Sequence, residues 1–175
     1  MGWTGLLVEP IPERFAQCKV NRPGSKVVHA ALGAQGAKGE TTFTITESVS
    51  GGMLSFRGEA TEHQRKKLEA EKAIERTITV PLTNLASLLE GCTDRVDAAI
   101  IDVEGGEVEV LTGMNLSKYR PRVMVFEDDL SNDQTDLMRF MQGYPEYIQV
   151  STLVGNRVFV HGDEREILAR VAEIF

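Results

Sequence analysis

The sequence predicts a three-layer α/β domain with a mostly parallel sheet and an antiparallel hairpin at its C-terminal end. Short runs that are apolar on both faces, such as residues 98–101, alternate with helical patterns, which is typical of parallel strands covered by helices. Two β-type stretches at 147–152 and 157–161 flank a short turn and indicate the hairpin. The 175 residues, 42% of them hydrophobic, are enough for a single domain over residues 1–175.

The N-terminal part of the chain predicts a strand, a helix and further strands. A continuous apolar run predicts the first strand at 5–9, and Pro10 and Pro12 follow it, in a first helical turn where proline is tolerated. The helix is expected to end near Asn21, because residues 23–24 (Pro-Gly) break it. The next strands are expected at 26–32, 41–46 and 53–56, the last two as a hairpin.

Residues 59–76 form a charged excursion between two apolar parts of the chain. Its apolar stripe is narrow and contains only Leu68, Ala70, Ala73 and Ile74. A segment with so little to bury is expected to be an exposed helix or a mobile excursion outside the core.

The remaining elements follow the same alternation. Thr83 is expected to cap a helix that contains Leu85, Leu88 and Leu89. A helix that begins at Glu107 has an acidic first turn, which suits the positive end of the helix dipole. Further strands are expected at 77–80, 96–103 and 122–126, and further helices at 107–113, 133–141 and 164–174.

The charge balance of the chain argues against polyanionic partners. Nineteen Lys and Arg residues against 26 Asp and Glu leave a formal charge of −7, which disfavours binding to nucleic acid and anionic lipid. The longest apolar runs are far shorter than the roughly 20 residues that span a bilayer. The start of the chain has no secretory signal pattern, and two cysteines make no disulfide framework. The sequence therefore predicts a cytoplasmic protein with neither nucleic-acid nor membrane partners.

Polar residues at strand ends are the candidates for a site, because ligands of open parallel sheets bind beyond the carboxyl ends of the strands. Glu9 ends the first strand, where its carboxylate is either a ribose acceptor for two hydroxyl hydrogen bonds or a solvated acid. Asp102 and Glu104 close the strand at 96–103, before two glycines that let a ligand approach the backbone. Carboxylates after so apolar a run are costly to bury without partners, which favours a cleft there. Residues 127–129 (EDD) are interpreted as a solvated turn.

Other patterns do not predict a site. The glycine-rich stretch 33–39 resembles a phosphate-binding loop, but a strand pattern follows it instead of a helix, so we interpret it as a flexible turn. His29, His63 and His161 stand in unrelated segments without metal-ligand spacing, and no metal site is predicted. For His29, a satisfied buried role is favoured over contact with a base or ring. The sequence contains no serine nucleophile motif, and neither cysteine has a histidine nearby.

Four segments together carry a resemblance to a known family: GWTGLLVEPIPERF, NRPGSKVVHAALG, VPLTNLASLL and IIDVEGGEVEVLTGMNLSKYRPRVMVFE. They are similar to the FkbM-type S-adenosylmethionine-dependent methyltransferases, which have a class I Rossmann-like methyltransferase fold. The resemblance extends from Gly2 to about Glu127. Its most specific part is the spacing D-V-E-G-x-E-x-x-V-L-x-G before an R-P-R strand.

The resemblance implies S-adenosylmethionine as the cofactor and methyl transfer to a hydroxyl group of a sugar, polyketide or similar small molecule. Glu9 is implied as the ribose-binding acid, and His29 and Ala30 as neighbours of the adenine. The catalytic candidates are Asp102, close to the methyl donor and acceptor, and Glu104, which positions the acceptor. Asp102 is also the candidate for accepting the acceptor's proton. The residues expected to bind the cofactor are Glu9, Pro10, His29, Ala30 and Asp102.

One part of the family pattern has no counterpart in this sequence. Family members begin with a strand and a glycine-rich turn of the V-D-x-G-A-x-x-G sort, so the sheet is expected to lack its first strand. That strand lies between the strands that end at Glu9 and Asp102, and without it two strand edges stay unpaired, which favours aggregation. Three explanations are open: a truncated gene product, which is favoured, a strand supplied by another chain in a homo-oligomer, or a closed-up non-catalytic module.

The sequence therefore leaves more than one class of function. The first is a methyltransferase, and the alternative is a non-catalytic binding or scaffold module that a partner chain completes. A nicotinamide-dependent oxidoreductase also binds ribose through a strand-end acid. The D-V-E-G-G motif and the terminal hairpin favour the methyltransferase over this third class.

Overall fold

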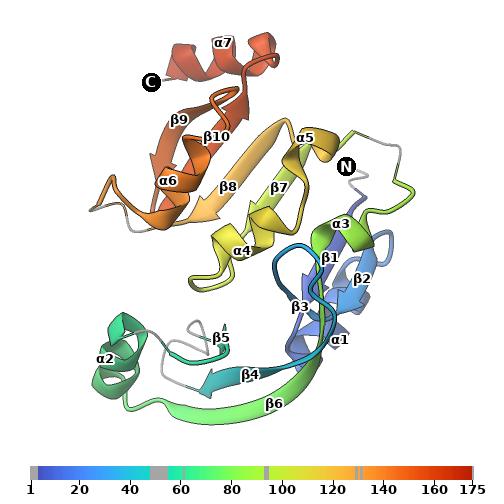
Figure 1. Ribbon diagram of the computed structural model, residues 1–175, viewed down its shortest axis with the longest axis vertical. Helices are drawn as coiled ribbons and strands as arrows, with labels where there is room; N and C mark the ends of the chain where they lie inside the picture. Colours follow the sequence, from blue (N-terminus) through green and yellow to red (C-terminus); the bar gives the residue numbers. More distant parts are fainter. Residues whose placement is uncertain are drawn as a thin grey trace.

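The computed structural model describes residues 4–47, 55–60, 62–92, 95–128, 130 and 132–174. Their strands form three sheets, and short helices connect and cover them (Figure 1). Within these ranges, every helix is too short or too polar to cross a membrane.

The first sheet is a parallel pair of strands, β1 (Leu6–Glu9) and β2 (Lys26–His29), connected by α1 (Pro12–Asn21). Pro12 occupies the first turn of α1, where its missing N–H needs no partner. The register places Glu9 opposite His29 at the carboxyl end of the pair. The predicted strand–helix–strand unit is therefore present, with Glu9 at its end.

The second sheet is built around a long antiparallel pair and contains, in order across the sheet, β3 (Ala31–Leu32), β6 (Ile74–Thr83), β4 (Gly39–Glu47) and β5 (Phe56–Arg57). α2 (Glu62–Ala70) follows β5. In Figure 1, β4 and β6 form a curved ribbon that carries β5 and α2 at one end. We refer to β4, β5, α2 and β6 as the arm. The buried side chains of Phe43, Ile45 and Val80 form part of the core at its base.

The third sheet contains, in order, β7 (Ala98–Ile101), β8 (Val123–Glu127), β10 (Asn156–His161) and β9 (Tyr147–Leu153). β7 and β8 are parallel, whereas β10 is antiparallel to both of its neighbours, which confirms the predicted terminal hairpin. The main core lies on this sheet, where Met124 and Phe126 are fully buried. The remaining helices are α3 (Leu85–Leu88), α4 (Glu107–Thr112), α5 (Leu116–Tyr119), α6 (Asp136–Met141) and α7 (Arg165–Ile174).

The mixed α/β class is confirmed, but the prediction of one mostly parallel sheet is wrong for the described residues. Three strand pairs are parallel and four are antiparallel, in three separate sheets. The physical reason is twofold. The β-branched residues of β4 pair with β6 instead of forming only a short hairpin, and no described strand lies between β1 and β7. Each of these two strands consequently has a neighbour on one side alone among the strands described.

Three local predictions also need correction. The strand predicted at 26–32 is interrupted at Ala30, so its two halves join different sheets. The N-cap of α3 is Asn84 and not Thr83, because the Asn84 side chain accepts a hydrogen bond from the Ser87 amide. The charged excursion does form a helix, yet Leu68 and Gln64 within it are buried. β4 and β5 form the predicted antiparallel hairpin, and its turn at 50–52 lies outside the described residues.

Candidate functional site

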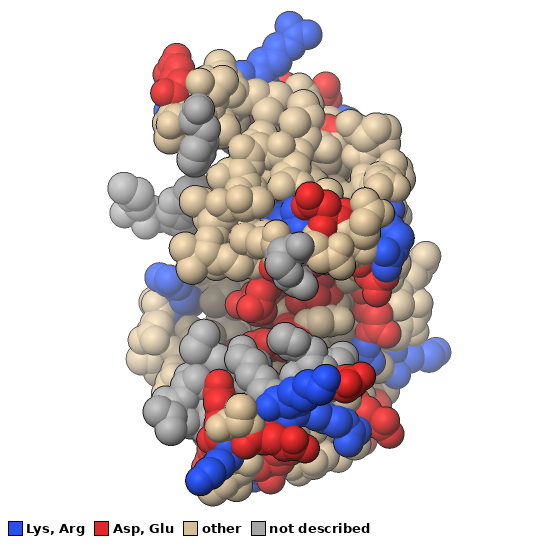
Figure 2. All heavy atoms as spheres, turned by 90° about the vertical axis from the view of Figure 1, so that its left-hand side faces the viewer, with Lys and Arg blue, Asp and Glu red and all other residues tan. Residues whose placement is uncertain are grey.

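A cavity of about 650 Å³ lies where the three sheets face one another. Its walls come from the carboxyl ends of β1, β7 and β8, from the loop before α4, and from the arm. Figure 2 shows Asp and Glu side chains gathered in the hollow between the upper and lower parts of the molecule. The volume is in the range of pockets that hold a small ligand or cofactor, about 300–1,000 Å³.

The loop from Asp102 to Glu107 forms one wall of the cavity and is sharply bent. Glu104 and Gly105 both have left-handed backbone conformations, with φ of 55° and 101°. Glycine adopts such a conformation at little cost, whereas Glu104 needs support from its surroundings. The Glu107 carboxylate provides part of it, because Oε1 accepts hydrogen bonds from the Val103 amide at 3.3 Å and the Gly105 amide at 3.1 Å.

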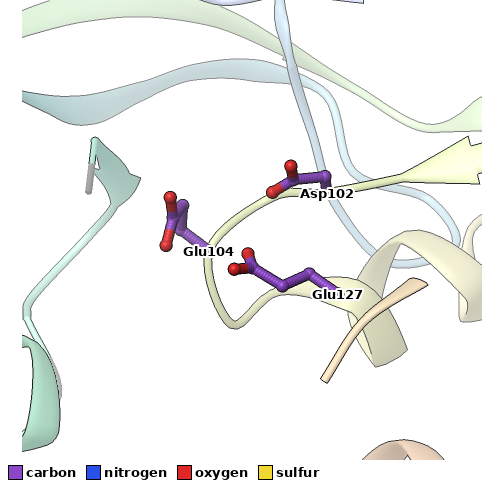
Figure 3. A group of neighbouring side chains, drawn as sticks. All are labelled: Asp102, Glu104 and Glu127. Atoms are coloured by element: carbon purple, nitrogen blue, oxygen red, sulfur yellow. The ribbon is translucent and has the colours of Figure 1, made fainter. Parts of the chain in front are cut away.

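Three carboxylates converge at this wall: Asp102, Glu104 and Glu127 (Figure 3). One oxygen of each lies within 4.8 Å of the others. The strand register explains the arrangement, since Ile101 of β7 is paired with Phe126 of β8, so the next residue of each strand is an acid. The bent loop then brings the third carboxylate, that of Glu104, to the same place.

The crowding of negative charge changes the protonation of Glu127. Partial burial at the end of β8, together with a hydrogen bond to Asp102 and repulsion from Glu104, raises the pKa of Glu127 to about 7. Neighbouring carboxylates of this kind can share a proton or bind a divalent cation through their oxygens. No metal ligands were predicted from the sequence, and the chain spacing of these acids gave no such signal.

Glu9 and its neighbours form another part of the same cavity. The side chain of Glu9 lines it, and its Oε1 accepts a hydrogen bond from the Ile11 amide at 2.8 Å. Pro10 and the buried Ala30 also contribute to the lining. His29 does not. Its ring stacks on Phe15 with 5.2 Å between centroids, and its Nε2 lies 2.9 Å from the Pro10 carbonyl oxygen.

The structure therefore brings together most of the residues proposed from the sequence. Five of them line one cavity: Glu9, Pro10, Ala30, Asp102 and Glu104. His29, also expected to bind the cofactor, does not line the cavity; it is half-buried and its Nε2 lies against the Pro10 carbonyl oxygen.

Several further residues of the cavity were missed by sequence reasoning. Glu127 is exposed, as the interpretation of residues 127–129 as a solvated turn implied, but it ends strand β8 and lines the cavity. The same interpretation is wrong for Asp128, whose side chain is only 10% exposed and pairs with buried Arg157 at 2.6 Å. Asp129 lies outside the described residues. The arm supplies a whole wall, from residues that the sequence patterns did not mark as site candidates: Phe43, Ser55, Phe56, Arg57, Glu59 and Gln64.

Comparison with known proteins gives one match. Residues 1–153 match the family described as the methyltransferase FkbM domain, which is most of the chain. Neither the curated proteins nor the solved structures include one that is significantly similar. The matched range contains β1, the arm, β7, β8 and all the residues that line the cavity. The chain therefore belongs to the methyltransferase FkbM domain family.

Proposed function

We propose that this chain transfers a methyl group from S-adenosylmethionine to a hydroxyl group of a small molecule, such as a sugar or a polyketide. The observation that carries the proposal is the shared cavity. Glu9 from β1 and the carboxylates of Asp102, Glu104 and Glu127 from β7 and β8 line the same space, although the sequence separates them widely.

The chemistry of the cavity fits this cofactor. One oxygen of Glu9 is held by the Ile11 amide, so the carboxylate has a fixed orientation toward hydroxyl donors such as those of a ribose. The small side chain of Ala30 leaves room for a flat ring. When bound, S-adenosylmethionine supplies an electrophilic methyl group on a positively charged sulfur, and a wall of carboxylates attracts that charge.

The acid cluster supplies the proton acceptor. Methyl transfer to a hydroxyl would form a carbon–oxygen bond, break the carbon–sulfur bond of the donor, which would leave as S-adenosylhomocysteine, and release the hydroxyl proton, which must reach a base. With a pKa of about 7, Glu127 is deprotonated in part at neutral pH and accepts this proton efficiently. Asp102 shares a hydrogen bond with Glu127 and remains the neighbouring acid, so the two act as a coupled pair.

The charge of the cavity also restricts the acceptor. Six carboxylates and two guanidinium groups line it, and Arg57, one of the two, is paired with Glu109. A phosphorylated or carboxylated acceptor is repelled by such a surface. We therefore expect a neutral or cationic hydroxyl compound. The lining acids are Glu9, Glu59, Asp102, Glu104, Glu109 and Glu127.

Calorimetric titration tests the proposal directly. S-adenosylmethionine and S-adenosylhomocysteine should both bind the folded chain, and the E9Q variant should bind them more weakly. Circular dichroism of each sample reports whether the fold is retained. A folded wild-type protein that gives no heat with either compound contradicts the proposal for this chain acting alone.

The open strand edges favour a second function, a non-catalytic module that a second copy completes. β1 and β7 each have one edge that no described strand occupies, and Ile100 of β7 is 75% exposed. An exposed apolar edge is a template for pairing with another chain. Light scattering after size-exclusion chromatography separates the two functions. A dimer without cofactor affinity supports the module, whereas a monomer that binds the cofactor excludes it.

A further inference from the structure

The arm contacts the loop from Asp102 to Glu107, which we call the acid loop, through the buried side-chain amide of Gln64. Gln64 lies on α2, within the charged excursion, yet only 8% of the residue is exposed. Its Nε2 donates a hydrogen bond to the backbone carbonyl of Glu104 at 2.7 Å. Gln64 also lies beside Gly105, since a Cβ atom there would be 3.9 Å from the same nitrogen. A buried residue from a segment remote in sequence thus touches the most strained part of the cavity wall.

This hydrogen bond supports an unfavourable backbone conformation at Glu104. Glu104 has φ of 55°, a conformation that is unfavourable for a residue other than glycine and persists only where the surroundings enforce it. Glu107 fixes the loop from inside, through the amides of Val103 and Gly105. Gln64 fixes the carbonyl between those amides from outside. Removing the Gln64 amide takes away this hydrogen bond, and we expect the Glu104 carboxylate to shift as a result.

Other contacts of the arm hold Gln64 in place beside the acid loop. Leu68, one turn after Gln64 on α2, is buried against Phe56 of β5. The neighbouring Arg57 forms an ion pair with Glu109 of α4, the helix that follows the acid loop. Phe56 and Arg57 themselves line the cavity opposite the three carboxylates. The arm is therefore joined to this loop at Glu104 and to the helix that follows it at Glu109.

We propose that Gln64 is a positioning residue that holds the Glu104 carboxylate against Asp102 and Glu127, and that the arm thereby forms the acceptor end of the cavity. This inference rests on the proposed methyl transfer for its kinetic readout alone. The hydrogen bond from Gln64 to Glu104 connects two walls of the cavity, the arm and the acid loop, which come from distant parts of the sequence. It also assigns a role to the charged excursion, which the general function of the family does not explain.

The coupling predicts an effect on Glu127 that does not require a known acceptor. The charged groups that face Glu127 are Asp102 at the end of β7, Glu104 in the loop and Glu107 on α4. Glu9 and the Arg57–Glu109 pair line the rest of the cavity. If Glu104 moves away, the repulsion that opposes ionisation of Glu127 decreases and the pKa of Glu127 falls. The Gln64 side chain is uncharged, so its removal cannot shift this pKa by a direct charge effect.

The test compares three variants of the full chain by carbon NMR of labelled glutamate carboxyls, with the Glu127 signal assigned through E127Q. Q64M keeps the size of the side chain but cannot donate. Q64A also removes the donor and adds no charge. E69Q changes an exposed residue of the same helix and serves as the control. We expect a Glu127 midpoint near 7 in the wild type and E69Q, and a midpoint lower by about one pH unit in Q64M.

Kinetics and binding complete the experiment. With an active acceptor, kcat of Q64M should fall about tenfold while the affinity for S-adenosylhomocysteine stays unchanged, since misplacing a group near the reacting atoms affects the chemical step most. If Q64M does not fold, Q64A answers the question, because it also removes the donor without adding a charge. An unchanged Glu127 midpoint in folded Q64M or Q64A overturns the inference. Absence of cofactor binding in the wild type contradicts only the proposed function, because the NMR midpoints still test Gln64.

Discussion

Asp102 and Glu127 are adjacent acids at the ends of two parallel strands, and one hydrogen bond connects their carboxyl groups. The pairing of Ile101 with Phe126 one position earlier fixes this arrangement. Two carboxylates so close cannot both ionise easily, which divides their roles. In the proposed methyl transfer, Glu127, whose pKa is raised to about 7, is the member of this pair that exchanges the proton.

The rate of methyl transfer should follow the ionisation of Glu127. Because the pKa of Glu127 is about 7, we expect the rate to rise with pH through neutrality as the base form accumulates. The E127Q variant should lose about 10²–10⁴-fold in kcat and lose this acidic limb of the profile. An initial-rate series from acid to mildly alkaline pH measures both effects. A variant that keeps the wild-type limb excludes Glu127 as the base.

The free energy of unfolding should also depend on the ionisation of Glu127, but it should fall as pH rises, whereas the rate should increase. The pKa of Glu127 is raised from 4.5 to about 7 on folding, so the folded state binds the proton more tightly than the unfolded state. Its contribution to stability is therefore complete below pH 4.5 and is lost as pH rises through about 7. Urea unfolding at a series of pH values should show this loss in the wild type and a flatter profile in E127Q. Equal slopes in the two proteins contradict the assignment.

The positions of the elements and the strand-end acids were predictable from sequence, whereas their lateral arrangement was not. Apolar runs followed by Glu9 and Asp102 are local signals, and parallel strands place their ends at a common edge. Glu127 could be predicted as a site residue only from the register of β7 against β8, and the order of residues in the chain does not give that register. Gln64 was hidden because its helix is charged along most of its surface, and its burial comes from contacts with distant residues.

The affinity for the cofactor should depend on the charge of Glu9. E9Q keeps a side-chain oxygen for the Ile11 amide, so the start of α1 is preserved while the charge is removed. A hydrogen bond to a charged group contributes about 1.5–3 kcal/mol, which corresponds to a loss of roughly 10–150-fold in affinity. Calorimetry with S-adenosylhomocysteine measures this loss. E13Q, an exposed change on α1, is the matched control and should bind like the wild type.

The stability of the fold at the end of β8 should depend on the buried ion pair between Asp128, which follows Glu127, and Arg157. The Arg157 side chain is 2% exposed and binds Asp128 through Nε at 2.6 Å, while Thr135 donates to the same carboxylate oxygen at 2.8 Å. R157M leaves Asp128 without its cation and should reduce the free energy of unfolding by about 3–5 kcal/mol. R139M removes an exposed pair with Asp136 and should change it by less than about 1 kcal/mol. If the two variants lose similar free energies of unfolding, burial does not make the Arg157–Asp128 pair more important for stability than the exposed pair.

Close packing between the glycine stretch 33–39 and α4 should make Gly113 intolerant of a side chain. A Cβ atom at Gly113 would lie 2.3 Å from the Gly33 carbonyl oxygen and 3.2 Å from the Asn84 Cβ, so backbone has to move to accept it. G113A should therefore lower the free energy of unfolding by about 1–3 kcal/mol, the usual cost of overpacking. At Gly24 a Cβ meets no atom within 4 Å, and G24A should be neutral or slightly stabilising because alanine restricts the unfolded chain. Urea midpoints compare the two directly, and a G113A protein as stable as G24A would show that the stretch 33–39 yields as a flexible turn does.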